Sequence, residues 1–127
     1  MIETALGIAN DELNKIGVPY EFMRWTSENI PDVYWIGEYS ETPTDAEDGY
    51  REGTLMLTGT GMNAWLELMQ HRAKIEDHFP IEGGLRISTA KGAVVIFYAN
   101  SFPVPTGEEN LKRMQVDLQI KAWKGMK

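Results

Sequence analysis

The last long segment of the chain, residues 111–124, places the strongest constraint on the fold. It reads LKRMQVDLQIKAWK. One set of alternate positions is apolar (Met114, Val116, Leu118, Ile120 and Ala122), and the other set is polar (Arg113, Gln115, Asp117, Gln119 and Lys121). Because successive side chains of a strand point to opposite faces, this pattern predicts a strand with one buried and one solvated face. The apolar face needs a cover, which two helical segments upstream can supply.

Those two segments have the periodicity of amphipathic helices. Residues 2–16 carry apolar side chains at helical intervals, and Gly17 is placed to end that helix. Residues 63–78 form the second helix, with Asn63 as its N-cap and Pro80 just beyond its end. One side of it is largely apolar (Trp65, Leu68, Met69, Arg72, Ile75 and Phe79). We expect this helix to be the main cover of the sheet because its apolar side is the larger.

Five further runs have strand composition, at residues 20–25, 33–40, 54–60, 85–89 and 93–100. The runs at 33–40 and 93–100 are apolar on both faces, which predicts either strands in the middle of the sheet or strands that meet another subunit. Residues 41–53 and 101–109 are expected to be loops. The order is α-β-β-β-α-β-β-β. It predicts a single α+β domain over residues 1–127, with two helices packed on a mostly antiparallel sheet of about five to six strands.

Composition narrows the class of function. The net charge is −7, from 19 acidic and 12 basic residues, which repels a phosphate backbone and argues against sequence-specific nucleic-acid binding. There is no cysteine, so disulfides and thiolate metal sites are excluded. The N-terminal residues lack the pattern of a signal peptide, and no apolar run approaches the ~20 residues of a membrane span. These features favour a cytosolic protein without a membrane partner.

Motifs for catalysis are not found. His71 and His78 lie seven positions apart on the second helix, so a metal site with Glu67 or Asp77 can be drawn, but surface histidines are the expected interpretation. The acidic loop does not fit a calcium-binding EF-hand, because the required glycine and glutamate positions hold Tyr50 and Met56. We predict no catalytic residue, no metal and no cofactor.

Contact with other protein subunits is the remaining expectation. The loop at 41–53 carries five acidic residues against one arginine. The predicted contact residues are Asp45, Glu47, Asp48, Tyr50 and Arg51 from this loop, and Arg113, Lys121 and Trp123 from the solvated face of the last strand. The basic and aromatic row on that strand could complement the acidic loop of a neighbouring subunit.

The layout resembles the tail terminator and tail-completion proteins of long-tailed bacteriophages, which are head-tail joining proteins. The likeness is carried by the N-terminal helix, the strand VYWIGEYS with the acidic loop ETPTDAEDGYREG, the helix NAWLELMQHRAKIEDHF and the terminal strand RMQVDLQIKAW. The resemblance implies a structural, non-enzymatic protein that forms a homo-oligomeric ring, usually a hexamer. Such a ring caps the tail tube and joins it to the head connector protein, in the virion and in the host cytoplasm during assembly.

Two alternatives remain open from the sequence. A small ligand-binding or enzymatic α+β domain of a bacterial cytosolic protein would have a concave pocket under the central helix. A general interaction module from a bacterial regulatory or toxin-neutralising system would also fit the small size and the acidity.

Overall fold

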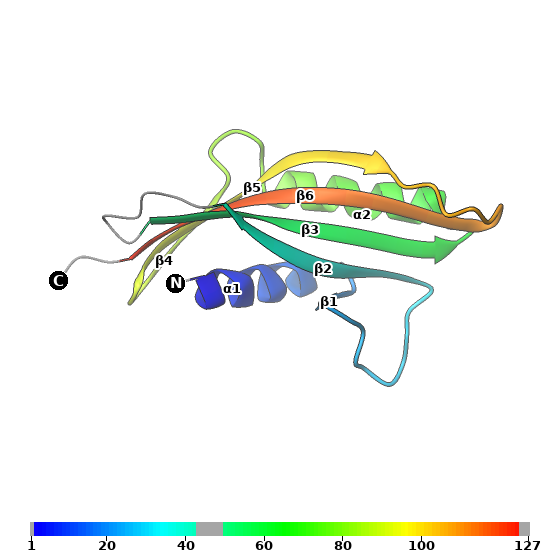
Figure 1. Ribbon diagram of the computed structural model, residues 1–127, viewed down its shortest axis with the longest axis horizontal. Helices are drawn as coiled ribbons and strands as arrows, with labels where there is room; N and C mark the ends of the chain where they lie inside the picture. Colours follow the sequence, from blue (N-terminus) through cyan, green and yellow to red (C-terminus); the bar gives the residue numbers. More distant parts are fainter. Residues whose placement is uncertain (1, 43–49, 125–127) are drawn as a thin grey trace.

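The computed structural model describes residues 2–42 and 50–124, and it confirms the predicted α+β class and order of elements (Figure 1). The elements are α1 (Ile2–Lys15), β1 (Tyr20–Phe22), β2 (Val33–Thr42), β3 (Tyr50–Met62), α2 (Trp65–His78), β4 (Leu85–Thr89), β5 (Gly92–Pro103) and β6 (Leu111–Lys124). None of the helices in these ranges is long and apolar enough to cross a membrane.

The six strands form one sheet in the order β1-β2-β3-β6-β5-β4. The short β1 runs parallel to β2, and every other pairing is antiparallel. The last strand, β6, pairs with β3 from Tyr50↔Trp123 to Met62↔Leu111, and on its other side with β5 from Gly92↔Lys124 to Pro103↔Met114. The final segment of the chain is therefore central in the sheet and joins the hairpin β2–β3 to the hairpin β4–β5.

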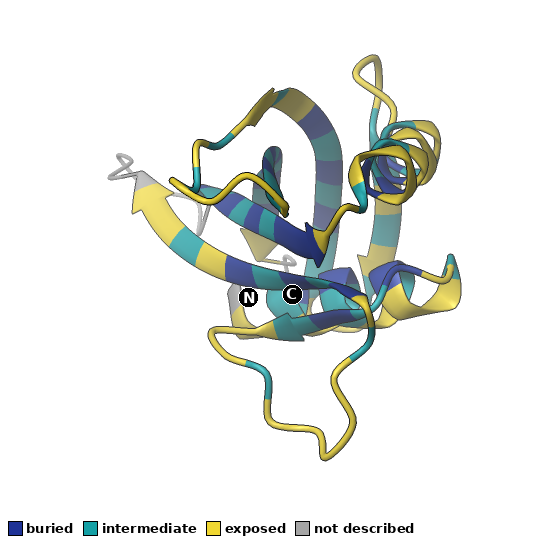
Figure 2. Cartoon of the chain, turned by 90° about the vertical axis from the view of Figure 1, so that its right-hand side faces the viewer, coloured by how far each residue is buried: buried dark blue, intermediate teal, exposed yellow. Residues whose placement is uncertain are grey.

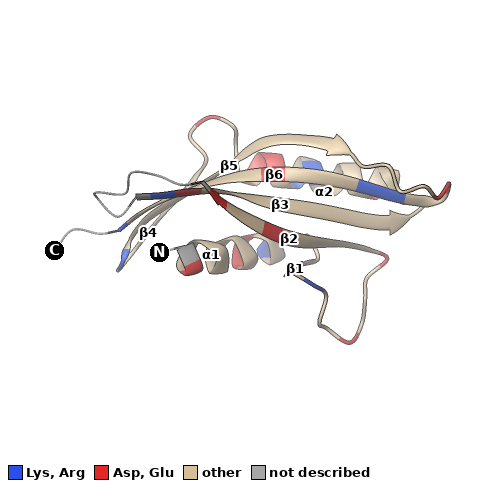
Figure 3. Ribbon diagram, viewed as in Figure 1, with Lys and Arg blue, Asp and Glu red and all other residues tan. Residues whose placement is uncertain are grey.

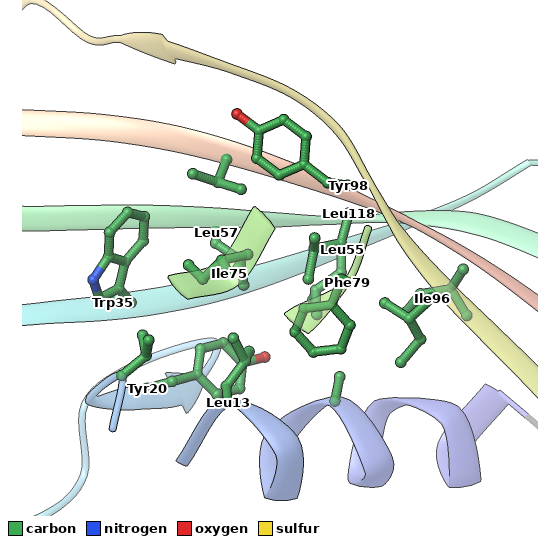
Figure 4. Close-up of a cluster of buried hydrophobic side chains, with 14 of the residues drawn as sticks. Leu13, Tyr20, Trp35, Leu55, Leu57, Ile75, Phe79, Ile96, Tyr98 and Leu118 are labelled. Atoms are coloured by element: carbon green, nitrogen blue, oxygen red, sulfur yellow. The ribbon is translucent and has the colours of Figure 1, made fainter. Parts of the chain in front are cut away.

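The buried face of β6 is the one that its alternation predicts. The exposed fractions of Val116, Leu118, Ile120 and Ala122 are 0%, and that of Met114 is 3%. Both helices pack on this face. Ala5, Ala9 and Leu13 of α1 and Leu68 and Ile75 of α2 join the same hydrophobic core. Figure 4 shows Leu13 and Ile75 among its side chains. Fully burying a leucine or isoleucine side chain stabilises the fold by roughly 1.5–3 kcal/mol relative to leaving it exposed.

Three glycines on strands are covered by aromatic rings from the preceding strand. A Cβ atom at Gly59 would lie 2.6 Å from the ring of Trp35, which is fully buried. Tyr39 covers Gly53 in the same way, and Tyr20 covers Gly37. Glycine normally weakens a strand. At these positions its missing side chain makes the space that each ring fills.

Several expected boundaries were wrong. The loop at 41–53 is shorter than expected, because β2 continues to Thr42 and β3 begins at Tyr50; residues 43–49 lie outside the described part of the chain. The loop at 101–109 is also shorter, because β5 continues to Pro103. The strand at 20–25 ends at Phe22, because Met23 has a φ of 71° and turns the chain.

The predicted cap of α2 was also wrong. Ala64 occupies the N-cap position without a side-chain hydrogen bond, and Asn63 precedes it with a φ of 50°. The backbone N–H of Asn63 donates to the carbonyl oxygen of Asn110 at 2.7 Å. Asn63 therefore forms a left-handed turn that ties the start of α2 to the loop between β5 and β6.

Candidate interaction surfaces

The two histidines have structural partners, and they do not form a metal site. His71 is 9% exposed, so the expectation of a surface histidine was wrong for it. Its Nδ1 accepts a hydrogen bond from the indole Nε1 of Trp35 at 2.9 Å. Burial lowers the pKa of His71, and Lys74 acts in the same direction while Glu67 opposes it. These facts describe a neutral imidazole that accepts at Nδ1 and carries its proton on Nε2.

His78 lies on the same helix but faces α1. Its Nε2 lies 2.6 Å from Oε1 of Glu12, so the pair joins α2 to α1. Within the described ranges, no group of three or more potential metal ligands is found.

The space between α2 and the sheet is packed with side chains. Leu68, Ile75 and Phe79 have no exposed surface, and His71 fills the adjacent position against Trp35. A ligand pocket under the central helix, which the small-molecule alternative requires, therefore has no room at these residues.

One end of the molecule exposes large apolar side chains. Leu66 is 73% exposed, Met62 59%, Phe102 42% and Trp65 38%, and all four lie where β3 passes into α2 or where β5 ends. Met23 and Ile30, which lie in the connection from β1 to β2 at the same end, are 61% and 63% exposed. Figure 2 looks onto this end and shows its connections coloured as exposed. We call these six residues the apolar end.

A groove of about 510 Å³ lies within this end. Its lining includes Trp65, residues 103–109 and the start of β6. Exposed apolar surface of this kind, gathered from separate connections, is typical of a protein interface.

Hydrogen bonds hold the connection from β1 to β2 in shape. The carboxylate of Glu21 accepts from the backbone N–H of Thr26 at 2.8 Å, from the hydroxyl of Thr26 at 2.6 Å and from the N–H of Ser27 at 3.3 Å. Hydrogen bonds from Ser27 and Thr26 lower the pKa of Glu21 to about 2. The exposed side chain of Met23 is thus presented from a constrained segment, in a left-handed conformation that few non-glycine residues adopt.

The polar face of β6 is largely paired with β3 inside the chain. Lys121 Nζ lies 3.9 Å from Oε1 of Glu52, and Gln119 donates to the same oxygen at 3.2 Å. Arg113 Nε lies 3.4 Å from the hydroxyl of Thr60. The row that the sequence predicts to be solvated is therefore half-buried among its own neighbours.

Among the predicted contact residues that the structure describes, Tyr50, Arg51, Lys121 and Trp123 lie at one end of the sheet, and Arg113 lies at the other. Arg113 lies near the apolar end, whereas Lys121 and Trp123 lie toward the opposite end of β6, about 26 Å away for eight residues of strand. Arg51 pairs with Glu41 at 3.5 Å, close to where β2 and β3 leave the described chain. Tyr50 pairs in register with Trp123. Asp45, Glu47 and Asp48 lie outside the described residues.

A second groove, which we call the hairpin groove, lies at the end opposite the apolar end. Its volume is about 560 Å³, and its lining includes Arg86, Val95, Phe97, Lys121 and Trp123 from β4, β5 and β6. Lys121 Nζ lies 5.6 Å from the centre of the Phe97 ring. Lys121 and Trp123 are among the contact residues predicted from the sequence, whereas Arg86 and Phe97 are not. Their alternation marks them as members of strands, but the order of the strands is needed to place them beside β6.

Comparison with known proteins supports the fold and goes no further. No protein-family model matches the chain, and no curated protein matches it. One solved structure, which carries no descriptive name, is similar over 99% of this chain and 96% of its own, with a TM-score of 0.69 and 14% sequence identity. The chain therefore belongs to the class of small α+β domains with this arrangement of helices and strands, and the shared fold assigns no activity to it.

Proposed function

We propose that this protein is a structural assembly protein of a long-tailed bacteriophage, which caps the tail tube and joins it to the head connector. It acts as a homo-oligomeric ring, which the resemblance implies to be a hexamer, in the virion and during assembly in the host cytoplasm. Its partners are copies of itself, the tail tube protein and the head connector protein. This proposal combines the resemblance in layout with the exposed surfaces of the domain.

The apolar end is the observation that carries the proposal. Its six exposed side chains come from three separate parts of the chain: the β1–β2 connection, the passage from β3 into α2, and the end of β5. Hydrogen bonds of Glu21 and Asn63 constrain the first two of these parts. Leaving such side chains in water forgoes roughly 25 cal/mol of stabilisation for each Å² of apolar surface. Burial of these side chains against another subunit accounts for their exposure in the single chain.

The two ends of the domain also differ in chemistry. The hairpin β4–β5 and the last part of β6 carry basic residues at the end of the long strands opposite the apolar end, and the start of β6 carries two more, Lys112 and Arg113, at the apolar end itself (Figure 3). A subunit that joins two different structures needs two different contact surfaces. This arrangement supplies them.

The first test is the composition of the assembly. The protein is mixed with the tail tube subunit encoded beside its gene, and the mixture is followed by sedimentation velocity and negative-stain electron microscopy. We expect rings on the ends of tubes of limited length. Genes for capsid and tail proteins on both sides of this gene are a second expected observation. A protein that leaves tube length and tube ends unchanged would contradict the proposal.

A matched pair of variants tests the apolar end. Leu66→Asp places a charge on the most exposed of its side chains, and Ala73→Asp places the same charge on an exposed position later in the same helix. We expect Leu66→Asp to abolish assembly and Ala73→Asp to preserve it, with both variants folded by circular dichroism. Equal assembly by both variants would remove the apolar end from the interface.

A further inference from the structure

The lining of the hairpin groove departs from the charge of the rest of the chain. The protein has 19 acidic and 12 basic residues, yet none of the eleven residues that line this groove is acidic. Arg86 and Lys121 are both among them. Lys91 at the turn of the hairpin and Lys124 at the end of β6 lie at the same end of the sheet. The groove is therefore a local basic site on an acidic protein.

The groove also offers an apolar floor. Ala93, Val95 and Phe97 follow one another on alternate positions of β5, and Trp123 lies opposite Ala93 on β6. Trp123 is 38% exposed. The side chains that favour burial at interfaces are Trp, Phe and Arg, and this site combines all three.

The cations are positioned to serve a carboxylate bound over that floor. The Nε–H of Arg86 donates to the carbonyl oxygen of Gly83 at 3.3 Å. The terminal N–H groups of a guanidinium form a planar fork that matches a carboxylate. Lys121 has a distant partner in Glu52 at 3.9 Å and lies over Phe97. An acidic group beside an apolar side chain would therefore meet both kinds of contact at once.

We propose that the hairpin groove binds an acidic segment of a partner protein that carries an aromatic or branched apolar side chain between its carboxylates. The groove borders β4, the end strand of the sheet, along which an extended segment can lie. A nucleic acid is disfavoured because the net charge of −7 repels a long phosphate chain more than a short acidic segment. This inference does not depend on the proposed role in a phage tail.

The test is a titration of the ¹⁵N-labelled protein, followed by two-dimensional NMR. The probe is the peptide acetyl-Asp-Glu-Phe-Asp-Glu-amide, and the control is acetyl-Asn-Gln-Phe-Asn-Gln-amide. We expect the acidic peptide to shift the amide signals of Arg86, Val95, Phe97 and Lys121 and the indole signal of Trp123. We expect this binding to weaken as salt is added, because the charges in the groove are partly exposed.

Two double variants distinguish the effect of the cations in the groove from the effect of the net charge of the protein. Arg86→Gln with Lys121→Gln removes the two cations of the groove and should weaken binding about tenfold, which corresponds to about 1.4 kcal/mol. Lys15→Gln with Arg24→Gln removes the same charge at exposed positions outside the groove and should leave binding unchanged. Trp123→Ala tests the apolar floor and should also weaken binding. The spectrum of each variant without peptide reports its fold.

Three outcomes would overturn the inference. The first is equal binding of the acidic and uncharged peptides, which would leave the cations without a role. The second is equal weakening by the two double variants, which would reduce the effect to net charge. The third is a shift of the groove signals on adding a short thymidine oligonucleotide, with no shift on adding the acidic peptide. That result would assign the site to a nucleic acid.

Discussion

Replacement of His71 by leucine should destabilise the fold, because it leaves the buried indole N–H of Trp35 without an acceptor. Trp35 is fully buried, and its indole N–H donates to Nδ1 of His71 at 2.9 Å. Leucine fills a similar volume but cannot accept this hydrogen bond. A buried donor left unsatisfied costs about 1–3 kcal/mol, so we expect His71→Leu to lower the free energy of unfolding by that amount.

A double-mutant cycle isolates this hydrogen bond from changes in packing. Trp35→Phe removes the donor, His71→Leu removes the acceptor, and the double variant removes both. We expect the double variant to be less destabilised than the sum of the single variants by about 1–3 kcal/mol, because no polar group is then left unpaired. Urea denaturation followed by far-ultraviolet circular dichroism measures all four proteins without relying on tryptophan fluorescence. Additivity within about 0.5 kcal/mol would refute the reasoning.

The same histidine should contribute to pH dependence with a defined sign. Burial lowers the pKa of His71 in the folded state, whereas an unfolded histidine titrates near 6.5. Below pH 6.5 the unfolded chain binds a proton that the folded chain does not. The free energy of unfolding therefore falls, by at most about 1.4 kcal/mol for each unit by which the pH is lowered. The stability gap between the wild type and His71→Leu should therefore narrow from pH 7.5 to 5.5. A constant gap would show that His71 is protonated equally in both states.

Two further predictions concern the hairpin β2–β3. Gly59→Ala should lower the free energy of unfolding by about 1–3 kcal/mol, because its Cβ would lie 2.6 Å from the ring of Trp35. The control, Gly7→Ala on the open surface of α1, should raise the free energy of unfolding by about 0.5–1 kcal/mol. Urea denaturation measures both variants, and equal effects would contradict the packing of Trp35 over Gly59. Replacement of residues 43–49 by a short Gly-Ser turn should leave the monomer folded and block assembly, and normal assembly in sedimentation velocity would remove that segment from the interface.

Much of the architecture follows from local patterns in the sequence. Alternation in residues 111–124 predicts which face of β6 is buried. Alternate side chains of a strand share one face, so the apolar set must be the one that the helices cover. The order of the strands does not follow, because β6 pairs with β3 and β5 across large distances in the sequence. Local patterns record which face a residue occupies, and they do not record its neighbour on the next strand.

The misread positions share a physical cause. His71 looks like a surface residue beside Glu67 and Gln70, and its burial becomes visible only when Trp35 is placed across from it. The hairpin groove has the same origin, because Arg86 and Phe97 meet Lys121 only after the hairpin β4–β5 docks on β6. Sites assembled from separate strands leave little trace in any one segment.

The glycines covered by aromatic rings also determine how β2 and β3 align. Trp35 lies over Gly59 and Tyr39 over Gly53. A shift of the pairing by two residues, which preserves the inner and outer faces, would move the ring of Tyr39 from Gly53 onto Leu55 or Arg51, where no glycine makes room for it. Only the observed alignment accommodates both rings, so strand slippage is suppressed from within the sheet. The length of the segment between the two strands can therefore change without moving the register of the sheet.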